Sequence, residues 1–287
     1  MGYTIAISNR KGGVGKTTLT ILLACELTRL GYKVLVVDCD SQRNSTDFFQ
    51  AEWENTATLA DIMYCKEPAE GCIQHCDFGD VIAADPALNN ADREIMDELV
   101  QDFKNGKIDD ILIDGEVYRI KDSIEPIKNK YDFILFDTAT SMDITLNNVI
   151  TASDYLIIPI EGQYAIDGLM DYIDYIKDSM VSVSDLTILG IVFNMFQKNA
   201  NLPSQVLDEA REIAAIKGTR VFDTPIRFST ACERAISDYR IPLHSVYRKS
   251  TTQADAEALT MEILKAIKKT PTGKSLTIKK YKKAKRG

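Results

Sequence analysis

Residues 8–20, SNRKGGVGKTTLT, constrain the fold of this chain more than any other stretch. The apolar run at residues 3–7 is typical of a short buried strand, and residues 16–30 have the pattern of a helix that Gly31 would end. A glycine-rich turn between a strand and a helix is the setting of a phosphate-binding loop. Its glycines let the backbone approach an anion closely, and the first N–H groups of the helix face that anion. The segment therefore predicts a nucleotide site in an α/β fold.

The residues of this loop have separate expected roles, which follow from the general pattern G-x-x-x-x-G-K-[ST]. Lys16 would reach the β- and γ-phosphates of a nucleoside triphosphate, and the hydroxyl of Thr17 would ligate Mg²⁺. We expect the nucleotide to contact Gly12, Gly13, Val14, Gly15, Lys16, Thr17 and Thr18.

The loop departs from the general pattern at its front, where Arg10 and Lys11 replace the usual first glycine and its neighbour. Lys16 already serves the phosphates, so a second lysine is hard to explain within one subunit. The sequence KGGVGKTT resembles the deviant Walker A motif of the ParA/MinD family of ATPases, and within it the ParA/Soj type. The resemblance implies that Lys11 crosses a dimer interface, contacts the ATP of the partner subunit and takes part in catalysis together with Lys16.

Two further apolar runs end in carboxylates. Residues 33–38 end at Asp38, with Asp40 two residues later, and residues 131–137 end at Asp137 in a Walker B pattern. Ligands of open α/β sheets bind beyond the carboxyl ends of the strands. The resemblance implies that Asp40 orients the attacking water, that Asp38 lies nearer the metal, and that Asp137 holds Mg²⁺. Asp40 as a simple cap of the following turn remains an alternative.

The loops after these strands differ from the family pattern. Ser41 replaces a usual proline and Arg43 a usual glycine, and Thr138, Ala139 and Thr140 replace a usual Cys-Pro-Pro. Ser41 and Arg43 affect the path of the Asp40 loop, and residues 138–140 affect the rigidity of the loop after Asp137. The metal role of Asp137 does not depend on these positions.

A predicted strand at residues 186–193 ends at Asn194, whose amide could pair with the N6 and N7 edge of adenine. The resemblance places the same residue at the base, and simple termination of the strand is the alternative. It also places Pro225 and Arg227 in a loop near the base. Residues 197–203 resemble a segment in which arginine contacts DNA, and here Lys198 and Asn199 stand at that place.

Strand and helix patterns alternate along the chain, which predicts a doubly wound, mostly parallel sheet with helices on both faces. We expect one domain at residues 1–270 and a basic tail at residues 271–287. Further helices are expected at residues 58–63, 91–103, 118–130 and 250–268, and a strand at residues 80–84. The cluster of Cys72, His75 and Cys76 fits no standard zinc spacing, which favours a packing or surface role.

Charge is distributed unevenly. The net charge is −8, yet residues 274–286 carry seven basic and no acidic side chains, which leaves 27 basic against 42 acidic residues elsewhere. Such a tail could neutralise DNA phosphates or could serve solubility alone. No apolar run approaches the roughly 20 residues that span a bilayer, so we expect a cytoplasmic, nucleoid-associated protein with no membrane partner.

The resemblance implies a Mg²⁺-dependent ATPase that forms a homodimer around ATP and binds DNA non-specifically. A centromere-binding protein of the ParB class would trigger hydrolysis, in the partitioning of plasmid or chromosomal DNA. Two alternatives stay open. One is a MinD-like ATPase that positions itself on membranes, although residues 274–287 offer few bulky apolar side chains. The other is a nucleotide-gated interaction protein with little turnover.

Overall fold

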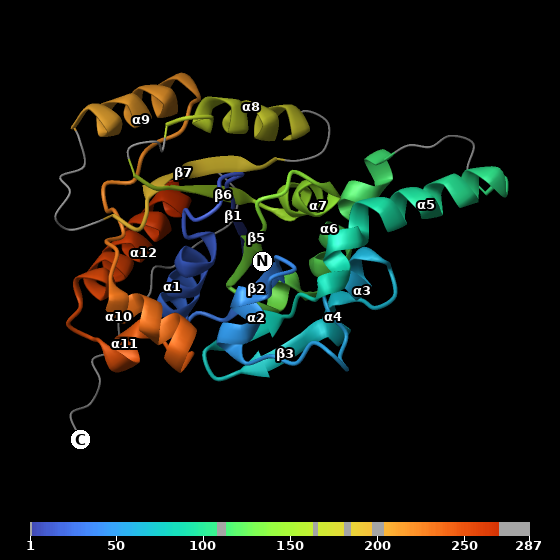
Figure 1. Ribbon diagram of the computed structural model, residues 1–287, viewed down its shortest axis with the longest axis horizontal. Coiled ribbons are helices and arrows are strands. Elements are labelled where there is room, and N and C mark those ends of the chain that lie inside the picture. Colours follow the sequence, from blue (N-terminus) through green and yellow to red (C-terminus); the bar gives the residue numbers. More distant parts are fainter. Residues whose placement is uncertain (1, 108–112, 163–165, 181–184, 197–203, 270–287) are drawn as a thin grey trace.

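A seven-stranded sheet in the order β3-β4-β2-β5-β1-β6-β7 forms the centre of the computed structural model (Figure 1). The structure describes residues 2–107, 113–162, 166–180, 185–196 and 204–269. All neighbouring strands run parallel except β3, which pairs antiparallel with β4. The strands are β1 (Tyr3–Ile7), β2 (Val34–Cys39), β3 (Ile73–Cys76), β4 (Gly79–Ile82), β5 (Phe133–Thr138), β6 (Tyr155–Ile160) and β7 (Thr187–Phe193).

Helices connect and cover these strands. The α-helices of the described residues are α1 (Lys16–Arg29), α2 (Asn44–Phe49), α3 (Leu59–Met63), α4 (Ala69–Cys72), α5 (Ala91–Lys104), α6 (Arg119–Ile124), α7 (Ile144–Ala152), α8 (Leu169–Met180), α9 (Ser204–Ile216), α10 (Thr230–Glu233), α11 (Leu243–Val246) and α12 (Thr251–Lys269). Three 3₁₀ turns, η1 (Pro86–Asn90), η2 (Ile113–Tyr118) and η3 (Glu125–Lys130), and one π-helical turn, η4 (Arg234–Tyr239), join them.

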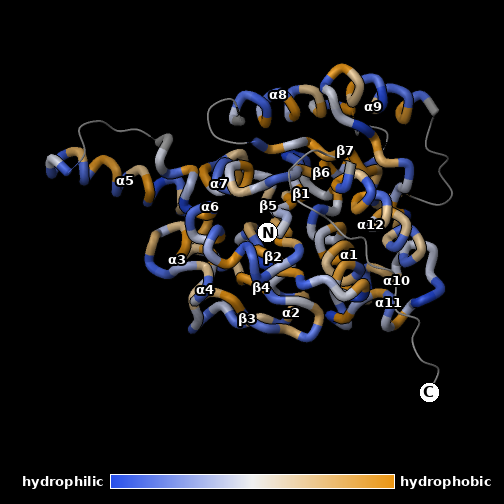
Figure 2. The backbone as a smooth tube through the Cα atoms, turned by 180° about the vertical axis from the view of Figure 1, so that it is seen from behind, coloured by the Kyte–Doolittle hydropathy of each residue, from blue (hydrophilic) through white to orange (hydrophobic). Residues whose placement is uncertain are grey.

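Each face of the sheet has its own hydrophobic core, because successive side chains of a strand point to opposite faces. In β1, Ile5 and Ile7 pack in the core that includes α1 and α12, whereas Ala6 lies in the core that includes α7 and α8. Apolar segments accordingly run through both layers of helices around the sheet (Figure 2). The unbroken apolar strands are the consequence of burial on both faces.

The sheet register places the predicted site. Ile7 at the end of β1 pairs with Asp137 of β5, and Asp137 pairs with Asp38 of β2. The three strands therefore deliver the phosphate-loop entry and both carboxylates to one edge of the sheet.

The predicted fold class is confirmed: the sheet is doubly wound and mostly parallel, with helices on both faces. Gly31 adopts φ +88° after α1, as expected for the residue that ends a helix. The single helix predicted at residues 118–130 is wrong, since α6 ends at Ile124 and η3 follows. Pro126 explains the break, because it lacks an N–H donor and its ring clashes with the preceding turn. The predicted tail at residues 271–287, together with Lys198 and Asn199, lies outside the described residues.

Candidate nucleotide site

The loop between β1 and α1 has the backbone shape that a phosphate requires. Gly13 and Gly15 adopt φ values of +78° and +75°, which are easily reached only by glycine. Asn9 braces the entry, because its Oδ1 accepts a 3.0 Å hydrogen bond from the N–H of Lys11 and its Nδ2 donates to the carbonyl of Pro159 at 2.8 Å. Gly12 and Gly13 are exposed at the tip. The loop is thus held in an open curve before α1 begins.

The two lysines of the loop lie in different surroundings. Lys16 is only 8% exposed. Burial lowers the pKa of its amine, although the negative charges of Asp137 and Asp40 act to raise it. Lys11 is exposed at the front of the loop. This difference agrees with the separate roles predicted for the two residues.

Asp38 and Asp137 form a buried pair on adjacent strands. Both are fully buried, and burial raises the pKa of each carboxyl, with the charge of Asp137 adding to the effect on Asp38. Ser45 Oγ donates a 2.7 Å hydrogen bond to Oδ2 of Asp137. Thr46 donates to Oδ2 of Asp38 from both its N–H and its hydroxyl, each at 2.8 Å. The first turn of α2 therefore holds both carboxylates.

One oxygen of this pair is suited to a cation. Both oxygens of Asp38 accept hydrogen bonds, since Oδ1 receives the N–H of Asp40 at 3.1 Å. Asp137 Oδ1 is buried and accepts no hydrogen bond within the described residues, and the side chain of Thr17 lies beside the same carboxyl. A carboxylate oxygen next to a hydroxyl is a donor set that Mg²⁺ prefers. The predicted metal residues are thus together, with Asp137 the more open of the two carboxylates.

Asp40 lies in the turn that follows β2, half-buried. Its Oδ1 accepts the N–H of Gln42 at 2.9 Å, and its carbonyl accepts the N–H of Arg43 at 2.8 Å. These are the turn-capping contacts that the sequence left open as an alternative. They orient the carboxyl group, and its charge acts on Lys16.

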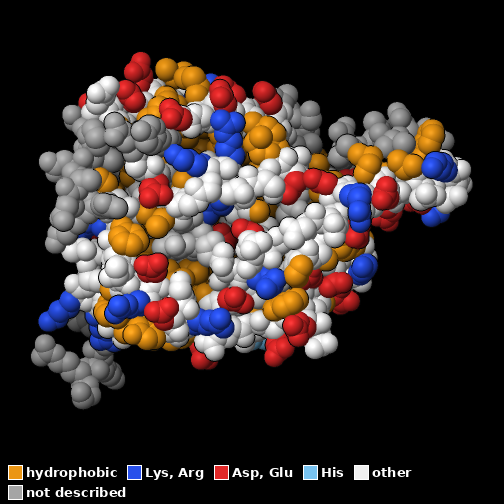
Figure 3. Space-filling view, viewed as in Figure 1, with side chains coloured by type: hydrophobic (Ala, Val, Ile, Leu, Met, Phe, Trp, Pro, Cys, Tyr) orange, Lys and Arg blue, Asp and Glu red, His pale blue; other side chains and the backbone are white. Residues whose placement is uncertain are grey.

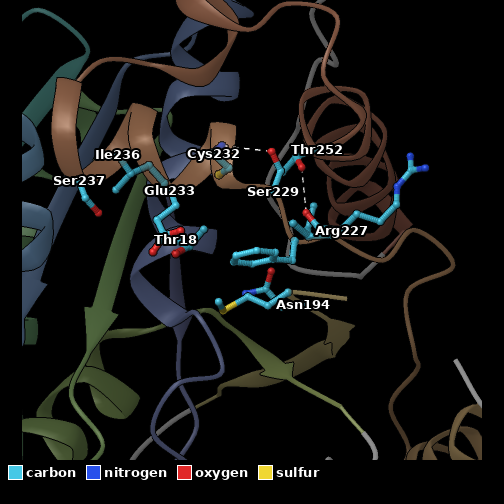
Figure 4. A pocket seen from close by; sticks show the side chains of 12 residues that line it. Thr18, Asn194, Arg227, Ser229, Cys232, Glu233, Ile236, Ser237 and Thr252 are labelled. Atoms are coloured by element: carbon cyan, nitrogen blue, oxygen red, sulfur yellow. Dashed lines mark hydrogen bonds between the residues drawn. The ribbon is translucent and has the colours of Figure 1, made fainter. Parts of the chain in front are cut away.

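A cavity of about 220 Å³ lies beside the start of α1, lined by Thr18, Asn194, Ile226 and Phe228 among others (Figure 4). Asn194 Nδ2 donates hydrogen bonds of 2.9 Å to the carbonyls of Val14 and Gly15, while its Oδ1 is buried without a partner in the described part of the chain. This amide orientation leaves Oδ1 alone for a base, so two-point pairing with N6 and N7 of adenine requires the amide to leave the loop.

Arg227 borders this cavity, but its guanidinium points away from it (Figure 4). The guanidinium makes a two-point pair with Asp255 of α12, through Nε at 2.7 Å and through Nη2. Pro225 precedes the lining residues without lining the cavity itself. Apolar Ile226 and Phe228 alternate with Arg227, a signal that could have identified them as the lining side chains.

The sequence analysis missed Asn9, Ser45 and Thr46, which brace the loop and the carboxylates. Their small polar side chains have many uses, and only their positions directly after β1 and the Asp40 turn could have singled them out.

Comparisons with known proteins agree with this geometry. A family model described as "AAA domain" matches residues 2–188. The chain is 30% identical over 218 residues to the "Chromosome partitioning protein ParA" of Myxococcus xanthus, covering 74% of this chain and 71% of that protein. It is 31% identical over 214 residues to the "Sporulation initiation inhibitor protein Soj" of Bacillus subtilis, covering 74% and 80%. The chain belongs to the ParA/MinD family of deviant Walker A ATPases.

The fold likeness reaches beyond these relatives. Cobyrinic acid a,c-diamide synthase from Mycobacterium smegmatis, solved with an ATP analogue and magnesium, superposes with a TM-score of 0.74 at 19% identity, covering 94% of this chain and 97% of the synthase. This likeness shows the shared fold of the ParA/MinD ATPases and the synthase.

Other candidate features lie outside the site. Cys72 is buried with its Sγ 3.4 Å from the carbonyl of Thr58, and exposed His75 pairs with Asp80 across the β3–β4 hairpin. Among the described residues, which include Cys72, His75 and Cys76, no group of three or more His, Cys, Asp or Glu side chains is arranged to hold a metal ion. The helices of the described ranges are all too short or too polar to cross a membrane.

Proposed function

We propose that this chain hydrolyses ATP in a Mg²⁺-dependent reaction and that two copies enclose the nucleotide between them. The observation that carries the proposal is the contrast between the two lysines of one loop. Lys16 is buried beside the carboxylates, whereas Lys11 is exposed at the front. The ATP analogue and magnesium bound to the synthase of the same fold support the choice of ligands.

Each site residue has a role in this reaction. Mg²⁺ bound beside Thr17 and Asp137 would neutralise charge on the β- and γ-phosphate oxygens. Lys16 and the N–H groups that open α1 bind the phosphates. Asp40 orients the attacking water from the turn after β2. Positioning and charge stabilisation carry such reactions, because the protein has little covalent chemistry to do.

The cavity beside Thr18 is the proposed place of the base. The buried Oδ1 of Asn194 can accept a hydrogen bond from the 6-amino group of adenine. The 6-oxo group of guanine is itself an acceptor, so it would face Asn194 Oδ1 without a hydrogen bond between them. This arrangement favours ATP over GTP.

Lys11 completes the site of the second subunit in this proposal. Its side chain is exposed on the same edge as the phosphate loop, from which it can reach a facing copy. The added cation would stabilise the transition-state charge on the partner's phosphates.

We also propose that the ATP-bound dimer binds DNA without sequence preference and acts in plasmid or chromosome partitioning at the nucleoid, with a ParB-class protein triggering hydrolysis. The relative from Myxococcus xanthus carries that partitioning name. Figure 3 shows basic side chains over the region of α10 and α11, and the exposed ones there are Arg234, Arg240, Arg248 and Lys249. The basic residues of the segment 274–286 supply seven further cations for DNA phosphates in this proposal.

The experiment that tests the dimer mechanism is mass measurement by light scattering with ATP and Mg²⁺, together with ATP hydrolysis. Asp40→Ala should form an ATP-bound dimer that does not turn over, because water is oriented only after assembly. Lys11→Ala should bind ATP and fail to hydrolyse it. An Asp40→Ala variant that stays monomeric, or a Lys11→Ala variant with normal hydrolysis, contradicts the mechanism.

The DNA role has its own test, in which residues 274–287 are deleted. Each lost phosphate contact should reduce the salt dependence of log K by about 0.9 per decade of salt. Equal affinity and slope would show that the tail serves solubility alone. Binding to anionic liposomes in place of DNA would instead support the membrane-positioning alternative.

A further inference from the structure

Arg43 occupies an unusual backbone position at a junction of the site. It adopts φ +60° and ψ +26°, a left-handed conformation that costs free energy for any residue with a Cβ. The residue stands at the N-cap of α2, directly after the Asp40 turn. Such a conformation persists only where surrounding contacts hold it.

The side chain of Arg43 packs on an aromatic ring. The Arg43 guanidinium carbon lies 4.2 Å from the ring centroid of Trp53, the only tryptophan of the chain. Arg43 Nε is buried and has no hydrogen-bond partner among the described residues, which is consistent with a guanidinium packed on a ring face. Nη1 donates to the carbonyl of Ser41 at 3.3 Å.

The segment that carries Trp53 is itself anchored. Gln74 of the edge strand β3 accepts the N–H of Glu52 at 2.8 Å and donates to the carbonyl of Glu52 at 2.6 Å. These two hydrogen bonds attach the residue before Trp53 to the β3–β4 hairpin, which lies below α2 in Figure 1.

Arg43 joins the two parts of the site that must be aligned. Its N–H donates to the carbonyl of Asp40 at 2.8 Å, and its carbonyl accepts the N–H of Asp47 in the first turn of α2. The two residues after Asn44 are Ser45 and Thr46, which hold Asp137 and Asp38. A shift at Arg43 would move the Asp40 carboxyl relative to both buried carboxylates.

We propose that Arg43 and Trp53 are positioning residues that fix the Asp40 turn against the buried carboxylates through their stack. The idea rests on the proposed ATP hydrolysis for its kinetic consequence but not for the stack itself. In this proposal Arg43 acts through its backbone contacts with the turn and α2, and not as a ligand of the nucleotide.

Four variants test the pair. Arg43→Gly and Trp53→Ala should each lower kcat by about tenfold while ATP affinity stays within twofold of the wild type, because misplaced catalytic groups slow chemistry without loosening the phosphate loop. Arg43→Lys keeps a cation and Trp53→Phe keeps a ring, so both should restore most of kcat. Arg43→Gly should also retain the melting temperature, because glycine adopts φ +60° without strain.

Gln50→Gly is the matched control, since Gln50 ends α2 with φ +56° and its side chain is exposed. It relieves the same backbone strain and should leave kcat unchanged. Trp53 emission, which reports on this ring alone, should change in Arg43→Gly and stay constant in Gln50→Gly.

The outcomes separate the two proposals. Normal kcat in both Arg43→Gly and Trp53→Ala overturns the positioning role while ATP hydrolysis stands. Unchanged Trp53 emission in Arg43→Gly overturns the stack, whatever the activity. If the wild type does not hydrolyse ATP, the proposed function has failed, and altered emission in Arg43→Gly still supports the stack.

Discussion

Asn194 lies so close to Gly15 that a Cβ added to Gly15 would stand 2.5 Å from Asn194 Nδ2. The same Nδ2 donates to the carbonyls of Val14 and Gly15, 180 and 179 residues earlier in the chain. Gly15 is thus required twice, for its φ of +75° and for this approach. The end of β7 supports the phosphate loop from behind.

Loss of these hydrogen bonds should weaken the binding of every nucleotide that uses the phosphate loop. Asn194→Ala removes two hydrogen bonds to carbonyls of the phosphate loop, which should cost about 1–3 kcal/mol, or roughly 5- to 150-fold in affinity. Calorimetry with ATP and GTP measures it. A loss for ATP alone would instead favour base recognition as the main role of Asn194. Asn194→Asp should reduce nucleotide affinity more than Asn194→Ala, because a carboxylate oxygen close to the two carbonyl oxygens repels them.

Lys16→Ala should abolish measurable ATP binding while the protein remains folded. The amine is buried without taking part in the hydrophobic core, and burial lowers its pKa, so its removal relieves an unfavourable burial. Calorimetry measures the loss of ATP binding, and thermal melting shows whether the protein remains folded. Unchanged binding would refute the assignment of the phosphate loop.

The stability of the metal-free protein should decrease as pH rises. Burial, followed by repulsion from Asp137, raises the pKa of Asp38 to about 8. The folded state then binds more protons than the unfolded chain between about pH 4 and pH 8, so the free energy of unfolding falls as pH rises through that window. Melting in EDTA across this range measures the slope.

Asp38→Asn is the control for this dependence, because it keeps an acceptor for Thr46 and removes the titration. Its melting temperature should change less with pH than that of the wild type. Equal slopes for the two proteins would show that other groups cause the effect.

The carboxylate of Glu26 pairs with Arg29 within α1 and accepts a hydrogen bond from Gln253 of α12. Glu26 is 1% exposed, and although burial raises the pKa of its carboxyl, the nearby His244 and hydrogen bonds from Arg29 and Gln253 hold that pKa below the ordinary value. Glu26→Ala should reduce the free energy of unfolding by about 3 kcal/mol, because it leaves buried donors without a partner. Chemical denaturation measures the change.

Glu257 provides the matched comparison, since it pairs with the same Arg29 at 2.6 Å but is 38% exposed. Glu257→Ala should cost less than about 1 kcal/mol. Equal losses for the two variants would mean that burial does not distinguish the pairs.

The sequence alone determined the features that depend on neighbouring residues. The glycines and Lys16 of the phosphate loop, the separate place of Lys11, and the buried strands that end at Asp38 and Asp137 all follow from contiguous patterns. Short segments of sequence largely determine local backbone conformation and strand burial, so these features could be predicted without knowledge of the fold.

The tertiary structure alone decided which side chains meet. Ser45 reaches Asp137 across 92 residues, and Asn194 turns its amide to the loop and only one oxygen to the cavity. Arg227 pairs with Asp255 rather than facing the predicted base, and Arg43 takes a glycine-like conformation over Trp53. Hydrogen bonds and ring contacts of this kind depend on the register and packing of distant segments, which no local pattern specifies.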